Sequence, residues 1–188
     1  MTLIRTVCAA AFIAASPLFA FADDITDAID QARKSYQGGD LAGAKQSLDL
    51  ASQLIGQKNA EGFAALLPAP LSGWKAEDAQ TTAIGSNVFG ASTATRAYRN
   101  AKDESVDVTI TGDNAMITQY ATFLNNPAIA GAMGKIIRVG NNRAIQTREG
   151  DIHIVIANKF LVTVTGSADA AAKMSYAQAV NYDKLSKM

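Results

Sequence analysis

The sequence contains one histidine, so hydrolytic or metal chemistry that uses an imidazole depends on His153. A transition-metal site ordinarily takes three or four N, S or O ligands, and one imidazole without a cysteine partner is a poor start for it. A Ser-His-Asp arrangement is arithmetically available, but no nucleophile-elbow pattern is present. We therefore predict a hydrogen-bonded structural histidine in a strand over residues 152–157, with a catalytic or ligand role as the alternative.

Carboxylates can perform acid–base chemistry without histidine, but two of them must face one cleft at a fixed separation. Asp103-Glu104 and Glu149-Gly150-Asp151 both occupy predicted turns, where acidic side chains are ordinarily solvated. No segment has the alternating acidic residues around a glycine that a calcium loop requires. The segment 85–90 has two glycines but lacks the lysine of a phosphate loop. The sequence thus predicts no catalytic residue, metal or cofactor.

Arginines form a candidate anion-binding group. If Gly140-Asn141-Asn142 is a three-residue hairpin loop, then Arg138, Gln146 and Arg148 share one face of the hairpin. Guanidinium groups on one face can hold a carboxylate or phosphate through paired hydrogen bonds. The alternative is that these exposed basic residues only favour solubility.

Apolar side chains near the middle of the chain form a second candidate site. A helix is predicted from Asn114, with Asp113 as its cap, and Asn126-Pro127 ends it. Its apolar residues, together with one from the following short helix, would line a pocket against the sheet or simply belong to the core: Met116, Ile117, Tyr120, Phe123, Leu124 and Met133.

The first 22 residues have the form of an export signal. Arg5 is the only charged residue before Asp23, an apolar run from Val7 to Phe21 follows it, and small residues at positions 20 and 22 fit a signal peptidase. The run is shorter than the roughly 20 residues of a membrane span and contains a proline. We predict cleavage after Ala22, export to the periplasm or beyond, and no stable membrane anchor afterwards.

Removal of this signal also removes Cys8, the one cysteine of the sequence. Disulfides, thiolate nucleophiles and cysteine-ligated metals are then excluded from the mature chain. The 188 residues include 17 basic and 17 acidic side chains, so loss of Arg5 leaves the protein nearly neutral. A chain without a basic field is a poor ligand for nucleic acid, and we predict none as partner.

Residues 23–67 are predicted to form a helical hairpin, with helices over 24–37 and 41–56 and a candidate extension over 60–67. Gly38-Gly39-Asp40 joins them, since glycine can end the first helix and Asp40 can cap the second. The pattern Ala32, Tyr36, Gly39, Leu41, Ala44, Leu48 and Ala51 resembles a single tetratricopeptide unit, although such units are stable only when about three stack. Residues 68–74 form a proline-containing linker.

Residues 75–188 are predicted to form an antiparallel α+β domain. A strand over 92–99 pairs with one over 104–111, a four-strand meander covers 135–166, and a helix capped by Ser167 runs to about Leu185. The position of the first strand between residues 75 and 90 is left open. This order, over residues 72–185, is similar to the fold of the PsbP and Mog1 proteins, but no motif accompanies the similarity and no functional residue is transferred.

These observations favour an exported accessory or binding protein without catalytic activity, which holds a protein partner or a small apolar ligand. One alternative is a hydrolase or isomerase with an unrecognised carboxylate, Ser or Thr centre. Another is an envelope-assembly factor that acts through its hairpin. An apolar cavity under residues 116–133 would favour the small ligand, and an exposed apolar surface on residues 24–56 would favour the protein partner.

Overall fold

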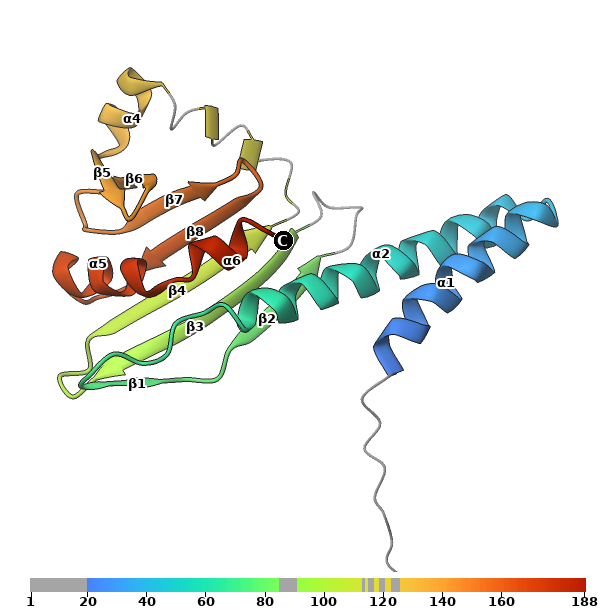
Figure 1. Ribbon diagram of the computed structural model, residues 1–188, viewed down its shortest axis with the longest axis horizontal. Coiled ribbons are helices and arrows are strands. Elements are labelled where there is room, and N and C mark those ends of the chain that lie inside the picture. Colours follow the sequence, from blue (N-terminus) through green and yellow to red (C-terminus); the bar gives the residue numbers. More distant parts are fainter. Residues whose placement is uncertain (1–19, 85–90, 113, 115–116, 119–120, 123–125) are drawn as a thin grey trace, which may run out of the picture.

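An antiparallel sheet with two long helices before it makes up the fold in the computed structural model (Figure 1). The structure describes residues 20–84, 91–112, 114, 117–118, 121–122 and 126–188. The helices are α1 (Ala20–Gln37) and α2 (Leu41–Ala64), which pack against each other. The predicted α+β class and the helical hairpin are confirmed.

The sheet has eight strands within the described residues, and all its pairs are antiparallel. They are β1 (Trp74–Ala76), β2 (Gln80–Ile84), β3 (Ala91–Asn100), β4 (Ser105–Gly112), β5 (Lys135–Val139), β6 (Asn142–Gln146), β7 (Ile152–Ile156) and β8 (Phe160–Thr165). Their spatial order is β1-β3-β4-β8-β7-β6-β5. The first strand, which the sequence left open, is two short strands, since β1 and β2 pair with different parts of β3.

The core lies on one face of this sheet. Alternate residues of the central strands, such as Val108, Ile154 and Val162, are fully buried there, as the period-two pattern requires. The C-terminal part of α2, α5 (Ala170–Ala179) and α6 (Tyr182–Leu185) cover this face (Figure 1). Tyr176 of α5 stacks on Tyr98 of β3, with ring centroids 4.3 Å apart. The sheet thus has one fully buried face.

The C-terminal helix differs from its prediction. Asp169, not Ser167, caps α5, because its side chain accepts a hydrogen bond from the backbone N–H of Ala172 at 2.8 Å. The hydroxyl of Ser167 instead accepts the N–H of Ser105. The helix stops at residue 179, where Val180 is extended and buried, and Asn181 caps the separate helix α6. Burial of Val180 in the core therefore divides the expected single helix in two.

The segment between β4 and β5 is described only in part. Of the predicted helix from Asn114, residues 117–118 and 121–122 are helical, and most of the others lie outside the described residues. The short helix α4 (Pro127–Met133) follows, and Asn126 caps it through the N–H of Ala128. Gly134 ends it.

Candidate functional site

The helical hairpin extends away from the sheet, and only the C-terminal part of α2 lies over the strands (Figure 1). Asp40 caps α2 by accepting the N–H of Gly43 at 2.9 Å, and Gly39 turns the chain with a φ of 81°. Both roles match the sequence prediction. The short turn makes α1 and α2 antiparallel neighbours.

Alanines fill the contact between the two helices. Ala28 and Ala32 of α1 and Ala44 and Ala51 of α2 are the buried residues along this part of the hairpin. Small side chains allow helix axes to approach closely. Two larger apolar residues, Ile25 and Leu54, are partly buried at the end of this contact, and the other large apolar residues lie beside it.

Five large apolar side chains are exposed on the hairpin at seven-residue spacing. Each is between 44% and 68% exposed, and together we call them the hairpin face: Ile29 and Tyr36 of α1, and Leu41, Leu48 and Ile55 of α2. Seven residues are close to two helical turns, so each set forms a stripe along one side of its helix.

The two stripes lie on the same side of the hairpin. Tyr36, Leu48 and Ile55 each follow a buried alanine by four residues, and Ile29 follows one by a single residue. On each helix, the exposed side chains are therefore rotated about the helix axis away from the buried alanines, and the sense of this rotation along the sequence is the same in α1 and α2. Because the helices run in opposite directions, equal rotations bring both stripes to one side of the pair.

Two charged residues lie along the hairpin face. Arg33 and Lys45 each follow a member of the face by four residues, and they pair with Asp30 at 3.2 Å and with Asp49 at 2.9 Å. Exposed pairs of this kind contribute at most about 1 kcal/mol to stability. Arg33 lies between Ile29 and Tyr36, and Lys45 lies between Leu41 and Leu48. The face is therefore apolar, with two cations among its side chains that are each paired with an aspartate of the same helix.

Helix α2 is attached firmly to the sheet beyond this face. The hydroxyl of Ser92 donates to the carbonyl of Gly56 at 3.0 Å, where the helix crosses the edge of the sheet. About two turns further on, the buried ring of Phe63 packs edge-on against Phe160, with centroids 5.7 Å apart. Gly112 lies under Phe63 and leaves no room for a Cβ atom. The free part of the hairpin thus projects from a rigid support.

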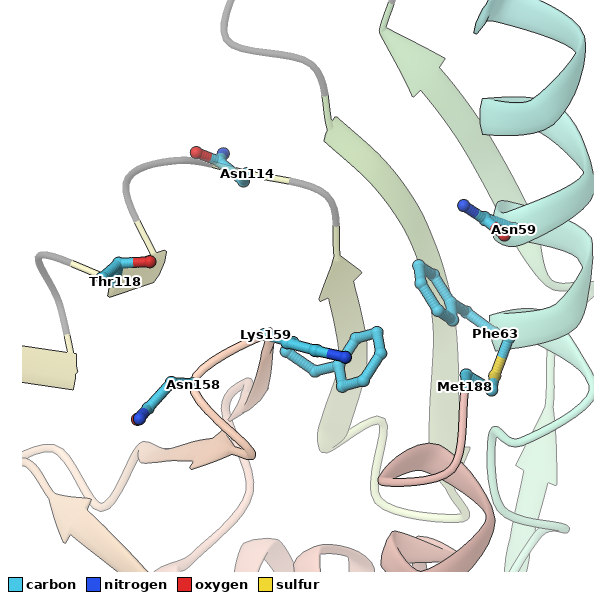
Figure 2. Close-up of a pocket in the computed structure, with 8 residues that line it drawn as sticks. Asn59, Phe63, Asn114, Thr118, Asn158, Lys159 and Met188 are labelled. Carbon is cyan, nitrogen blue, oxygen red and sulfur yellow. The ribbon is translucent and has the colours of Figure 1, made fainter.

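An open cavity of about 420 Å³ lies beside this attachment (Figure 2). Phe63, Phe160 and Met188 provide its apolar part. Its other lining residues are polar: Asn59, Asn114, Thr118, Asn158 and Lys159. The volume suits a small molecule, but the polar lining does not suit an apolar one.

Among the described residues, none of those predicted to form an apolar pocket lines this cavity. Met116, Tyr120, Phe123 and Leu124 lie outside them. Ile117 is buried, whereas Met133 at the end of α4 is exposed. The segment contributes Asn114 and Thr118 to the cavity instead.

The predicted grouping of Arg138, Gln146 and Arg148 is wrong. The turn between β5 and β6 contains two residues, since Val139 pairs with Asn142, and not the three that the prediction assumed. A change of one residue moves every later side chain to the other face of a sheet. Arg138 therefore lies opposite Arg143, and Gln146 points to the core face. Arg148 lies beyond β6, in the exposed turn that follows it.

His153 lies on the half-buried face of β7, opposite Thr163 of β8. Burial lowers its pKa, and the nearby carboxylate of Asp151 opposes this effect. Asp151 itself is bonded to a lysine, and the cavity of Figure 2 is lined by other residues.

A pH dependence of stability follows from the lowered pKa of His153. The unfolded chain, with a histidine pKa near about 6.5, takes up a proton before the folded protein does. Stability is therefore complete above that pH and is lost as the pH falls through it toward the lower pKa of the folded state. Urea unfolding of the wild type and of His153→Gln at several pH values should show this loss only in the wild type. If the free energy of unfolding changes with pH in the same way in both proteins, the prediction is wrong.

A buried ion pair is the feature that the sequence did not predict. Lys173 of α5 is 2% exposed, and its ammonium donates to Asp151 at 2.6 Å and to the carbonyl of Glu149 at 3.0 Å. Asp151 was expected to be a solvated turn residue, but its side chain is only 28% exposed. The pair ties α5 to the turn before β7, and nothing in the local pattern around Lys173 indicates it.

Within the described ranges, no group of three His, Cys, Asp or Glu side chains is placed to hold a metal ion. Nor is any helix of the described part long and apolar enough to cross a membrane.

The fold and these surfaces define an α+β protein with a projecting helical hairpin. No protein-family model, curated protein or solved structure matches the chain. The resemblances to the PsbP and Mog1 fold and to a tetratricopeptide unit stay predictions.

Proposed function

We propose that this is an exported, non-catalytic binding protein whose hairpin face holds a protein partner. The observation that carries the proposal is the strip of five large apolar side chains on a hairpin that extends away from the sheet. An exposed apolar strip is typical of an interaction surface. Export rests on residues 1–22, which have the form of a signal peptide.

The shape of the hairpin face indicates the kind of partner. Its side chains project in two parallel rows at heptad-like spacing, which is the arrangement that accepts the ridges of other helices. Two charged residues, Arg33 and Lys45, lie among these side chains, and each is paired with an aspartate of its own helix. The partner surface is therefore helical and apolar, with little net charge along the contact.

A small apolar ligand is the less favoured occupant. The cavity beside Phe63 presents four amide or hydroxyl side chains and an ammonium group. An apolar molecule entering it would remove these groups from water without replacing their hydrogen bonds, which is costly. On the hairpin face, the two cations Arg33 and Lys45 are already paired with aspartates, which limits this cost.

Site-specific cross-linking in living cells tests the proposal. A photo-reactive phenylalanine analogue replaces Leu48 in one variant and Leu50 in another. Leu50 is the matched control, because it is on the same helix and is also half exposed, but it points to the other side of the hairpin. We expect a discrete adduct from position 48, at several times the yield from position 50.

Equal yields from the two positions, or a diffuse ladder of adducts from both, would contradict the proposal. Mass spectrometry of a discrete adduct identifies the partner. This identification also bears on the inference that follows.

A further inference from the structure

We infer that the occupant of the hairpin face is the hairpin face of a second copy of this chain, so that two hairpins form a four-helix bundle about a two-fold axis. This inference rests on the proposed function, because it names the partner of the same surface. Four observations support it.

The spacing is the first observation. Leu41, Leu48 and Ile55 recur every seven residues along α2, and Ile29 and Tyr36 do so along α1. Side chains at this spacing stay aligned with a neighbouring helix over several turns. The fully buried residues between α1 and α2 are alanines, so the five exposed large residues remain available to form the layer between two hairpins.

The symmetry of the surface is the second observation. A two-fold interface uses the same patch on both subunits, and the patch must be complementary to itself. An antiparallel pair of helices meets this condition. A two-fold axis that lies between the two faces, parallel to the helices, places each α1 opposite the α2 of the other copy. Rows of Leu, Ile and Tyr side chains can then interleave with identical rows.

Charge is the third observation. After loss of Arg5 the exported chain keeps 16 basic and 17 acidic residues, so the overall charge opposes association of two copies only weakly at neutral pH, although residues 23–56 carry six acidic and three basic side chains. Along the hairpin face, Arg33 and Lys45 are neutralised by Asp30 and Asp49 of the same chain. The face therefore offers no single-sign field that would select an oppositely charged partner.

Size is the fourth observation. The part of the hairpin that carries the face is about 25 Å long and about 20 Å wide, given the rise and diameter of α-helices. Two copies would bury about 1,000 Å² in total, which is near the lower limit of specific interfaces. The dimer should consequently be reversible and form in the micromolar range.

Sedimentation equilibrium of the exported protein, from about 1 to about 200 µM, is the test. We expect the mass to rise from one chain to two over this range. Leu48→Gln should weaken the dimer at least about thirtyfold, as expected at the centre of an interface. Leu50→Gln, on the other side of the same helix, should leave the dissociation constant unchanged. Circular dichroism confirms that both variants fold.

A wild type that stays monomeric at every concentration overturns the inference, and so does a dimer that Leu48→Gln and Leu50→Gln weaken equally. The cross-linking experiment separates this failure from failure of the proposed function. A monomer with a discrete adduct to a different protein at position 48 refutes only the second copy as partner. A monomer without any adduct refutes both.

Discussion

Replacement of Asp151 by asparagine is expected to lower the free energy of unfolding by about 3–5 kcal/mol. The change removes the negative partner of Lys173, whose side chain is 2% exposed. The ammonium would keep its bond to the carbonyl of Glu149, but its charge would be left without compensation in the interior. Burial of an unpaired charge is among the most costly single defects in a folded protein.

Replacement of Lys173 should lower the free energy of unfolding by less than replacement of Asp151. Lys173→Met leaves the carboxylate of Asp151 unpaired, but this group is 28% exposed and water can solvate part of its charge. The methionine also retains most of the apolar contacts of the lysine stem. Combining Asp151→Asn with Lys173→Met should recover a large part of the stability lost in Asp151→Asn alone, because no unpaired charge remains.

Urea unfolding followed by circular dichroism measures these differences. The matched control is Asp49→Asn, which breaks a Lys–Asp pair of similar distance on the surface of α2. Because both of its side chains are well exposed, that change should cost less than about 1 kcal/mol. If Asp151→Asn proves no more costly than Asp49→Asn, the pair is not buried as described.

Phe63→Ala is the second change with a large expected effect, a loss of about 3–5 kcal/mol. Phe63 is buried, contacts Phe160 edge-on, and fills the space above Gly112. Its removal loses the apolar transfer free energy of a large side chain and leaves a cavity that the rigid strands below cannot close.

The same change should loosen the attachment of the hairpin. Phe63 is the largest buried side chain that α2 places on the sheet, so amide hydrogen exchange along residues 56–64 should increase more than exchange in β7 and β8. Leu50→Ala on the exposed side of the same helix is the control, with an expected effect within about 0.5 kcal/mol. Equal losses in the two variants would show that Phe63 does not anchor the hairpin.

Local patterns account for the elements that the sequence predicted correctly. The hairpin turn follows from Gly39 and Asp40, whose backbone freedom and capping carboxylate act within a few residues. The strands β3 and β4 follow from alternation of apolar and polar side chains, which is itself a short-range property. The end of α4 at Gly134 has the same local origin.

The pairing register of β5 and β6 could not be predicted from the local sequence pattern. A glycine followed by two asparagines is compatible with turns of two or three residues, and the difference of one residue reverses the face of every side chain beyond the turn. Pairing of Val139 with Asn142 selects the two-residue turn. It buries Val139 and Ala144 together and separates Gln146 from Arg138.

The amino-acid sequence by itself determined the helical hairpin, the β5–β8 meander, the α+β class and the apolar heptad spacing on residues 29–55, because each depends on neighbours along the chain. Tertiary structure alone decided which of those apolar residues stay exposed and which carboxylate meets Lys173. Residues 151 and 173 belong to different elements, and the alanines of α1 and α2 become buried only when the two helices pack. Such pairings depend on how elements approach in space, and no local pattern contains that information.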